Sequence, residues 1–414
     1  MELQINKNSP LVMHIDLNSC FATCIQQAYP HLRGKPIAIA AYTTPNGCIL
    51  APSIEAKRYG IKTGMTVREG KLLFPDLIVR PSDPVLVRDV HIKFRNICRD
   101  YSPNVAPKSI DELIIDFHGM EHLNIDLVTI AKEIKLRFRQ EIGDWISCNV
   151  GISTNRFLAK LAASLHKPDG LDIVDHGNLL DIYSKVTLID LNGINKRYEA
   201  RLNANGIFTP LEFLHSSEIT LRKQVFQSIV GKYWYFRLRG FEMDDVEFTR
   251  KSYGQDYALK KHTSDPKEVA RIVMKLVEKM GRRVRGVQKA AHGFHVGMIY
   301  NDGTYWHKGK TFHTEAYTTQ EFFKRALYIL NLQPAKKPIS KITISCYGLV
   351  ESNASQDELF EYANKDRKVS EAVDMINDRY GEYVVTPAIM MGMNSEVLDR
   401  ISFGAIKELE DLYN

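Results

Sequence analysis

The chain has 414 residues, of which 44% are hydrophobic and 25% are charged, and its formal net charge is +6. This composition is ordinary for a soluble globular protein, and the length exceeds what one hydrophobic core usually supports, so we expect two to four domains. We find no signal peptide, no apolar run of transmembrane length and no low-complexity tract, and the six cysteines are scattered. These features argue against a membrane-spanning or disulfide-stapled protein and favour a reduced, cytosolic one.

The first predicted element is a strand over residues 11–16, which delivers the carboxylate of Asp16 at its end. Residues 17–27 have the apolar spacing of a helix. The four-residue spacing of Cys20 and Cys24 is typical of one helix face rather than of a zinc site. The alternative role for Asp16 is an ordinary helix N-cap.

Two adjacent carboxylates, Asp111 and Glu112, precede an apolar run that predicts a buried strand. Strand side chains alternate between faces, so both can reach one ion only at the strand end or in the turn before it. If this strand neighbours the one ending at Asp16, three carboxylates meet with only Lys108 as a nearby cation in sequence. Such a cluster suits a pair of Mg²⁺ ions that assist phosphoryl transfer. The alternative is a solvated turn.

Both carboxylate segments belong to longer motifs, His-Ile-Asp-Leu-Asn-Ser-Cys-Phe-Ala at residues 14–22 and Ser-Ile-Asp-Glu-Leu at residues 109–113. They resemble the two metal-binding motifs of the Y-family translesion DNA polymerases. Further blocks resemble that family's fingers and post-catalytic segments, at residues 33–39, 55–61, 150–160 and 166–170. The blocks occur in the family's order and spacing, and the resemblance continues to residue 385.

The resemblance implies an α/β (α+β) multidomain fold, a right-hand polymerase with palm, fingers, helical thumb and a βαββαβ-type little finger. It implies a template-directed DNA polymerase that inserts deoxynucleotides opposite damaged or undamaged template, cytoplasmic and associated with the nucleoid. Its partners would be primer-template DNA and deoxynucleoside triphosphates (dNTP). The expected ranges are palm 1–30 and 80–174, fingers 31–79, thumb 175–246, little finger 247–350 and C-terminal tail 351–414.

The resemblance also assigns roles to residues at the metal site. Asp16, Asp111 and Glu112 would ligate two Mg²⁺ ions, for which Mn²⁺ is a possible substitute. The carbonyl of Leu17 would be a main-chain ligand. The physical interpretation agrees, because phosphoryl transfer needs positioning and charge neutralisation more than covalent chemistry.

Nucleotide contacts follow from the same resemblance. Phe21 falls on the steric-gate position, where a bulky ring would clash with a ribose 2′-hydroxyl; the alternative is a core aromatic residue. Lys167 would reach the triphosphate and Lys160 the DNA backbone, although either lysine could be a solvated surface cation. The expected nucleotide-binding residues are Ser19, Cys20, Phe21, Ile54, Lys57 and Lys167.

The chain departs from the common family pattern at several of these positions. Asn18 stands where many members have a second acidic residue, and Ile54 and Lys57 stand where many have Tyr and Arg. Lysine keeps the charge but not the bidentate fork of arginine. Asn18, Lys57 and residues 46–51 look closer to the catalytic subunit of DNA polymerase V, whereas residues 167–170 look closer to DNA polymerase IV, so the subgroup stays open.

Residues 175–246 predict short helices. Within them, residues 191–195 resemble the hairpin of a helix-hairpin-helix, and Gly193 and Asn195 are expected to present backbone N–H groups to a DNA phosphate. Both residue types tolerate positive φ. The alternative is an ordinary helical turn.

The C-terminal third carries a segregated charge. Residues 250–345 contain 19 Lys and Arg against 7 Asp and Glu, a net charge of +12 in a chain that is +6 overall. This predicts a surface for a polyanion, and by resemblance a little finger that grips DNA backbones. Arg282, Arg283 and Arg285 are expected to hold phosphates; the alternative is a solvated helix end.

The segment Gln-Asp-Glu-Leu-Phe at residues 356–360 resembles the peptide by which bacterial polymerases dock on the sliding clamp. Gln356, Leu359 and Phe360 would fill its hydrophobic pocket. Residues 371–380 predict a terminal helix.

Three rival interpretations are kept. One is a polymerase V-like subunit that needs accessory subunits, and another is a non-catalytic DNA- or clamp-binding paralogue. Clustered carboxylates beside DNA would repel its backbone unless bound to metal, which argues against the paralogue. The third is a metal-dependent nuclease, which fits Phe21 and the basic C-terminal region less well.

Overall fold

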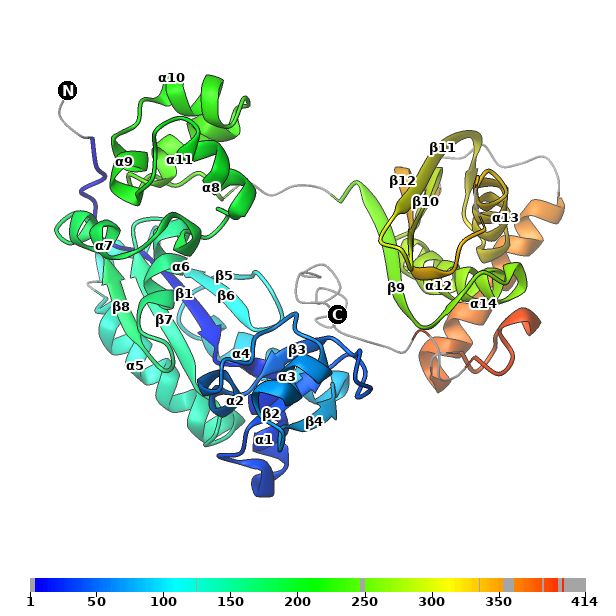
Figure 1. Ribbon diagram of the computed structural model, residues 1–414, viewed down its shortest axis with the longest axis horizontal. Coiled ribbons are helices and arrows are strands. Elements are labelled where there is room, and N and C mark those ends of the chain that lie inside the picture. Colours follow the sequence, from blue (N-terminus) through cyan, green and yellow to red (C-terminus); the bar gives the residue numbers. More distant parts are fainter. Residues whose placement is uncertain are drawn as a thin grey trace. The chain divides into compact units, whose positions relative to one another are not determined.

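The computed structural model describes residues 4–123, 125–245, 250–334, 336–352, 361–381, 383–393 and 397, with no side chains for 361–364 (Figure 1). The chain forms two compact units that divide between Glu247 and Phe248, and each is described by itself. Both units mix helices and strands, as the sequence predicts. Among the described residues, no helix is long and apolar enough to cross a membrane.

The first unit is built on a five-stranded sheet in the order β5-β6-β1-β7-β8. Its central strand β1 is antiparallel to both β6 and β7. Side chains of β1 alternate, so Met13 and Ile15 belong to the main core, whereas Val12 packs with Ile114 and Ala159 on the opposite face. The strands are β1 (Val12–Leu17), β5 (Asn104–Pro107), β6 (Glu112–Asp116), β7 (Cys148–Ser153) and β8 (Leu171–Val174).

Helices cover both faces of this sheet. The Met13 face shares its core with α4 and α5, and α6 lies on the other face (Figure 1). A Cβ at Gly151 of β7 would lie 2.1 Å from the Ala159 carbonyl oxygen, so this glycine permits the close approach of α6. The helices are α1 (Cys20–Ala28), α4 (Pro84–Arg99), α5 (Leu127–Arg137) and α6 (Arg156–Leu165).

A smaller sheet in the order β3-β2-β4 has its own core within the first unit. Thr66 and Glu69 form a capping box that begins α3. The elements are β2 (Ile37–Ala40), β3 (Ile49–Pro52), α2 (Ile54–Arg58), α3 (Val67–Leu73) and β4 (Ile78–Pro81).

The remainder of the first unit consists of short helices around a third core, in which Trp234 packs against Phe213 and Phe226. The helices are α7 (Leu179–Lys185), α8 (Lys196–Asn203), α9 (Pro210–His215), α10 (Glu218–Thr220) and α11 (Val230–Arg237).

Short 3-10 or π-helical turns occur in both units. They include η1 (Pro30–Leu32), η2 (Glu121–Leu123), η3 (Phe138–Ile142), η4 (Leu188–Asp190), η5 (Leu221–Val225) and η7 (Ala388–Met390).

The second unit is a four-stranded antiparallel sheet in the order β11-β10-β12-β9, with α12 and α13 packed against it. The element order is the predicted βαββαβ. Asp265 caps α12, whose first residue is Pro266. The elements are β9 (Ser252–Thr263), α12 (Pro266–Gly286), β10 (Lys289–Tyr300), β11 (Tyr305–Ala316), α13 (Thr319–Leu330) and β12 (Ile339–Glu351).

A further layer from the C-terminal part of the chain packs on α12. It comprises α14 (Glu361–Tyr380) and residues 383–393. Arg271 donates to the carbonyl oxygens of Ile389 at 3.1 Å and Met391 at 2.5 Å, and Lys275 donates to that of Met393 at 2.7 Å. The second unit therefore extends well past the predicted end of its βαββαβ core.

Candidate active site

The two carboxylate segments meet on neighbouring strands. Asp16 of β1 lies directly opposite Glu112, the first residue of β6. Asp111 lies in the turn before β6, and the backbone N–H of Leu17 donates to its carbonyl oxygen at 2.9 Å. Asp16 is not a helix N-cap, because Ser19 occupies that position of α1.

The turn that carries Asp111 is held from two sides. The buried His91 of α4 donates its Nδ1–H to the carbonyl oxygen of Ile110 at 2.8 Å, and the hydroxyl of Ser109 donates to the Asp111 carboxylate. Burial raises the pKa of Asp111 to about 6; the Ser109 hydrogen bond opposes this rise, and the neighbouring carboxylates add to it. The charged form of Asp111 is therefore costly here.

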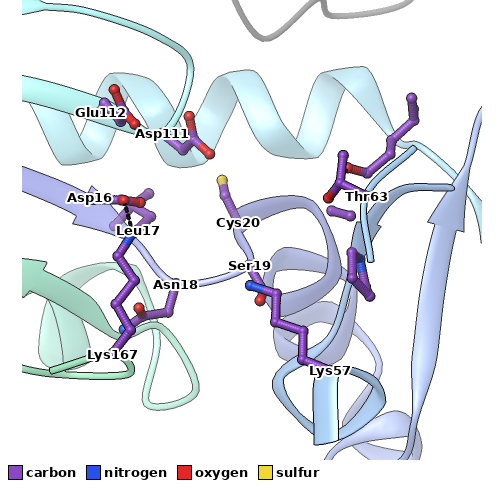
Figure 2. Close-up of a pocket in the computed structure, with 13 residues that line it drawn as sticks. Asp16, Leu17, Asn18, Ser19, Cys20, Lys57, Thr63, Asp111, Glu112 and Lys167 are labelled. Atoms are coloured by element: carbon purple, nitrogen blue, oxygen red, sulfur yellow. Dashed lines mark hydrogen bonds and ion pairs between the residues drawn. The ribbon is translucent and has the colours of Figure 1, made fainter. Parts of the chain in front are cut away.

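Two lysines lie against the facing carboxylates. Lys160 of α6 donates to Glu112 Oε2 at 2.6 Å, and Lys167 donates to Asp16 (Figure 2). Like charges directly opposite each other on adjacent strands repel, so these lysines stabilise the pair. In the part of the chain that the structure describes, no three His, Cys, Asp or Glu side chains are grouped closely enough to hold a metal ion. The carboxylates are instead oriented by the lysines.

A cavity of about 230 Å³ lies beside the carboxylates. The end of β1, the start of α1 and the turn before β6 form one side, and β3 and α2 form another (Figure 2). Its lining residues are Asp16, Leu17, Asn18, Ser19, Cys20, Leu50, Ala51, Pro52, Lys57, Thr63, Asp111, Glu112 and Lys167. The cavity thus brings together every predicted metal ligand with the predicted nucleotide contacts Ser19, Cys20, Lys57 and Lys167.

Phe21, Ile54 and Lys160, which were expected near the nucleotide or the DNA backbone, do not line this cavity. Phe21 is only 1% exposed and belongs to the core beneath β1. Ile54 begins α2, and Lys160 is the partner of Glu112. The structure pairs Lys160 with the carboxylate opposite Asp16, and a DNA-backbone contact for this lysine stays a prediction.

Lys57 approaches the cavity from α2, which Ser53 caps by accepting the backbone N–H of Ala56. Burial lowers the pKa of Lys57, and the charge of Lys167 lowers it further, while Asp16 and Asp111 partly offset both effects. Two lysines and three carboxylates thus line one small cavity, which offers groups for an anion as well as for cations.

Sequence reasoning missed two features of the site. Thr63 lines the cavity and donates its hydroxyl to the carbonyl oxygen of Leu50 at 3.1 Å, but no chemical motif marks it. His14 is 1% exposed, and neither ring nitrogen has a hydrogen-bond partner among the described residues. Burial lowers its pKa to about 3, with Lys160 and other lysines adding to the effect. The two-residue period of β1, which places His14 on the face of Asp16, was the available signal.

Comparison with known proteins identifies the chain. Residues 15–164 match the model of the impB/mucB/samB family, and residues 250–359 match the C-terminal domain of that family. The DNA polymerase IV of Moorella thermoacetica is 32% identical over 389 residues, covering 92% of this chain and 96% of the relative. The chain belongs to the Y-family of translesion DNA polymerases.

Other relatives and one solved structure agree. The DNA polymerase IV 1 of Bacillus subtilis is 28% identical, covering 91% of this chain and 92% of the relative. The Y-family DNA polymerase chimera Dbh-Dpo4(243-245)-Dbh shares the fold, with a TM-score of 0.73 at 21% identity over 82% of this chain and 99% of that chain. As a translesion DNA polymerase, the protein uses primer-template DNA and dNTP and depends on divalent metal ions.

The two residues of the hairpin at residues 191–195 that were expected to contact DNA differ in backbone conformation. Gly193 has φ of +99°, but Asn195 has φ of −108°. Asn195 is instead the N-cap of α8, where its side chain accepts the backbone N–H groups of Arg197 and Tyr198. Of the two residues, only Gly193 uses the positive φ that both residue types tolerate.

The arginines expected to grip DNA are engaged inside the second unit. Arg285 is 3% exposed and forms a bidentate pair with Asp374 of α14, at 2.5 and 2.9 Å. Arg282 donates to Asp378 at 2.6 Å, and Arg283 packs over the ring of Tyr253. The DNA-contact prediction for Arg285 is corrected, because a buried guanidinium with a paired carboxylate cannot meet a phosphate. The charge count over residues 250–345 did not include α14, whose carboxylates pair with Arg282 and Arg285.

The predicted clamp-binding residues of the polymerase, Gln356, Leu359 and Phe360, lie outside the described residues. They fall between Ser352, which follows β12, and Glu361, which begins α14.

Proposed function

We propose that the cavity binds the incoming dNTP together with two Mg²⁺ ions, held by Asp16, Asp111, Glu112 and the main-chain carbonyl of Leu17. The observation that carries this is three carboxylates from two neighbouring strands lining a cavity that two lysines also line. Carboxylate and carbonyl oxygens suit Mg²⁺, and Mn²⁺ accepts the same donors.

The electrostatics of the residues fit divalent cations. Asp16 and Glu112 face each other across β1 and β6, and Asp111 has a raised pKa beside them. In the structure, the ammonium groups of Lys160 and Lys167 supply the positive charge beside Glu112 and Asp16. With divalent cations in that role, Lys167 would be free to contact a phosphate.

In the reaction, the primer 3′-hydroxyl oxygen bonds to the α-phosphorus of the dNTP. The bond from that phosphorus to the bridging oxygen breaks, pyrophosphate leaves, and the hydroxyl proton passes to solvent. When bound, the two cations neutralise charge on the attacking and leaving oxygens. Lys57 and Lys167 would bind the triphosphate as point charges. Ser19 and Cys20 would present the start of α1, where backbone N–H groups favour anions.

The steric gate remains part of this proposal. Phe21 follows Cys20, which lines the cavity, so a deoxyribose lying against the start of α1 would be next to the Phe21 backbone. Ile54, at the start of α2, would border the same nucleotide. The core position of the ring would then limit the space left for a 2′-hydroxyl.

DNA contacts are proposed to use exposed cations and backbone groups rather than the buried Arg285. Lys308 and Lys261 are exposed on β11 and β9, and Gly193 offers the hairpin backbone. Such phosphate contacts are salt-sensitive and independent of sequence. Clamp docking through residues 356–360 and a need for accessory subunits are further proposals that primer extension can test.

The test is primer extension on an undamaged template with Mg²⁺ and dNTP, comparing wild type with Asp111→Asn. We expect extension by wild type and a loss of at least about a thousandfold in the variant, since charge stabilisation would be incomplete. Primer-template affinity should stay nearly unchanged.

Asp116→Asn is the matched control, because Asp116 ends β6, the strand that follows Asp111, and lies outside the cavity. Extension that persists in Asp111→Asn would contradict the metal assignment. Inactivity of wild type with intact DNA binding would favour a subunit that needs accessory proteins.

A further inference from the structure

The loop of residues 166–170 carries Lys167 to the cavity, and Lys135 of α5 fastens this loop from outside the cavity. Lys135 Nζ donates to the carbonyl oxygen of Asp169 at 2.6 Å and to that of Gly170 at 3.2 Å, and it lies 3.0 Å from Asp169 Oδ1. Two backbone carbonyl oxygens thus accept hydrogen bonds from the ammonium group, and the Asp169 carboxylate pairs with its charge. The Lys135 side chain is 15% exposed and does not line the cavity.

A second cation strengthens the same attachment. Arg139, four residues after Lys135 and within η3, pairs with Asp169 Oδ2 at 2.5 Å. Asp169 therefore receives both cations from one continuous helical segment, two residues after Lys167. Charge-assisted hydrogen bonds to backbone and carboxylate oxygens are among the stronger contacts available to a loop.

The loop is held on its other side by Asn149 of β7. Its side-chain amide donates to the carbonyl oxygens of Ala163 at 3.0 Å and His166 at 3.2 Å, and its backbone lies opposite Asp16 in the sheet. A Cβ at Gly170 would lie 2.2 Å from the His166 carbonyl oxygen, so the loop is a tight turn. The backbone on each side of Lys167 is thus fixed, although its long side chain is free to change partner.

We propose that Lys135 is a positioning residue for nucleotide insertion, which fixes the 166–170 loop so that Lys167 can pass from Asp16 to the triphosphate. This inference rests on the proposed role of Lys167. A flexible lysine aims at a phosphate only as well as its backbone is placed, and Lys135 sets that placement through contacts to Asp169 and Gly170. Arg139 supports it through the carboxylate of Asp169.

The test is single-nucleotide insertion kinetics with Lys135→Met in the full-length protein. We expect the KM for dNTP to rise roughly 10- to 100-fold, the size expected for lost charge-assisted hydrogen bonds, with primer-template Kd unchanged. Lys135→Arg should restore much of the affinity, because a guanidinium can still donate to both carbonyl oxygens. Lys132→Met, an exposed lysine one turn earlier on α5, is the matched control and should behave as wild type.

A double-mutant cycle with Lys167→Ala decides whether Lys135 acts through Lys167. If it does, Lys135→Met adds little to the effect of Lys167→Ala; multiplicative effects would overturn the inference. An unchanged KM in Lys167→Ala would instead overturn the proposed function. If Lys135→Met fails to fold, as judged by thermal unfolding, Asp169→Asn replaces it in the cycle, because it removes the carboxylate but keeps the carbonyl oxygen. The same non-additivity is then expected.

Discussion

The three carboxylates at the cavity differ in how the fold stabilises their charge. Asp16 and Glu112 face each other across two strands, and each is stabilised by a lysine. Asp111 has a hydroxyl from Ser109 rather than a cation, and burial raises its pKa to about 6. The charge of Asp111 therefore does not stabilise the fold, and its proposed role is to hold a metal ion.

Asp111→Asn should therefore stabilise the protein while abolishing extension. The pKa of Asp111 rises from 3.8 to about 6 on folding, so the folded state binds the proton more tightly and ionisation lowers stability as the pH rises through that interval. At pH 7.5 in EDTA we expect the variant to gain about 1 to 3 kcal/mol, less than the full shift because water screens a partly exposed group. Thermal unfolding at several pH values measures this.

The gain should shrink toward pH 4, where Asp111 is neutral in the folded protein. A gain that is the same at pH 4 and pH 7.5 would refute the link to ionisation. Asp116→Asn, at the far end of β6, controls for the loss of an aspartate outside the cavity.

At the site, sequence reasoning identified the residues that a short motif encodes. Asp16, Asp111 and Glu112 each follow from a strand pattern with carboxylates at its end, and all three line the cavity. The pairing of Lys160 with Glu112 was not predicted, because a contact between residues 48 positions apart depends on how α6 packs over the sheet. The same limit hid Lys135, whose partners lie 34 and 35 residues away.

At the scale of elements, the second unit combines a predicted sheet with an unpredicted partner helix. The resemblance to the Y-family polymerases implied the βαββαβ order, which the structure has, and Asp265 caps α12. The sequence also placed a helix at residues 371–380, but not its contact with α12. From the sequence, the arginines of α12 were expected to contact DNA. Their carboxylate partners on α14 lie some 90 residues further along the chain, as with Arg285 and Asp374, and no local pattern indicates that pairing.

Breaking this helix contact should destabilise the second unit. Asp374→Ala leaves the guanidinium of Arg285, 3% exposed, without its carboxylate, and we expect a loss of roughly 3 kcal/mol in the free energy of unfolding. Asp378→Ala is the matched control on the same helix: its side chain is 68% exposed, and loss of its pair with Arg282 should cost less than about 1 kcal/mol. Denaturant unfolding compares them. Equal effects would show that burial does not decide the strength of these pairs.

At the scale of the whole molecule, the two units have separate cores and different charge. The net charge of +12 over residues 250–345 is reduced by α14, whose Asp374 and Asp378 pair with α12. Lysines such as Lys261 and Lys308 stay exposed, and the proposed DNA contacts through them would be salt-sensitive and made to phosphates rather than to bases. Charge counting predicted the polyanion partner but could not say which cations the fold leaves exposed.

Recruitment of the polymerase to a primer end is expected to depend on residues 356–360. Residues 356–360 lie between two elements of the second unit, so a clamp bound there would hold the whole polymerase near DNA and raise its effective concentration. Changing both Leu359 and Phe360 to Ala should abolish stimulation of primer extension by the clamp, because these side chains would fill its pocket. Extension without clamp should match wild type, and Asp357→Ala with Glu358→Ala should keep the stimulation. Stimulation that survives the loss of Leu359 and Phe360 would place the clamp contact elsewhere on the chain.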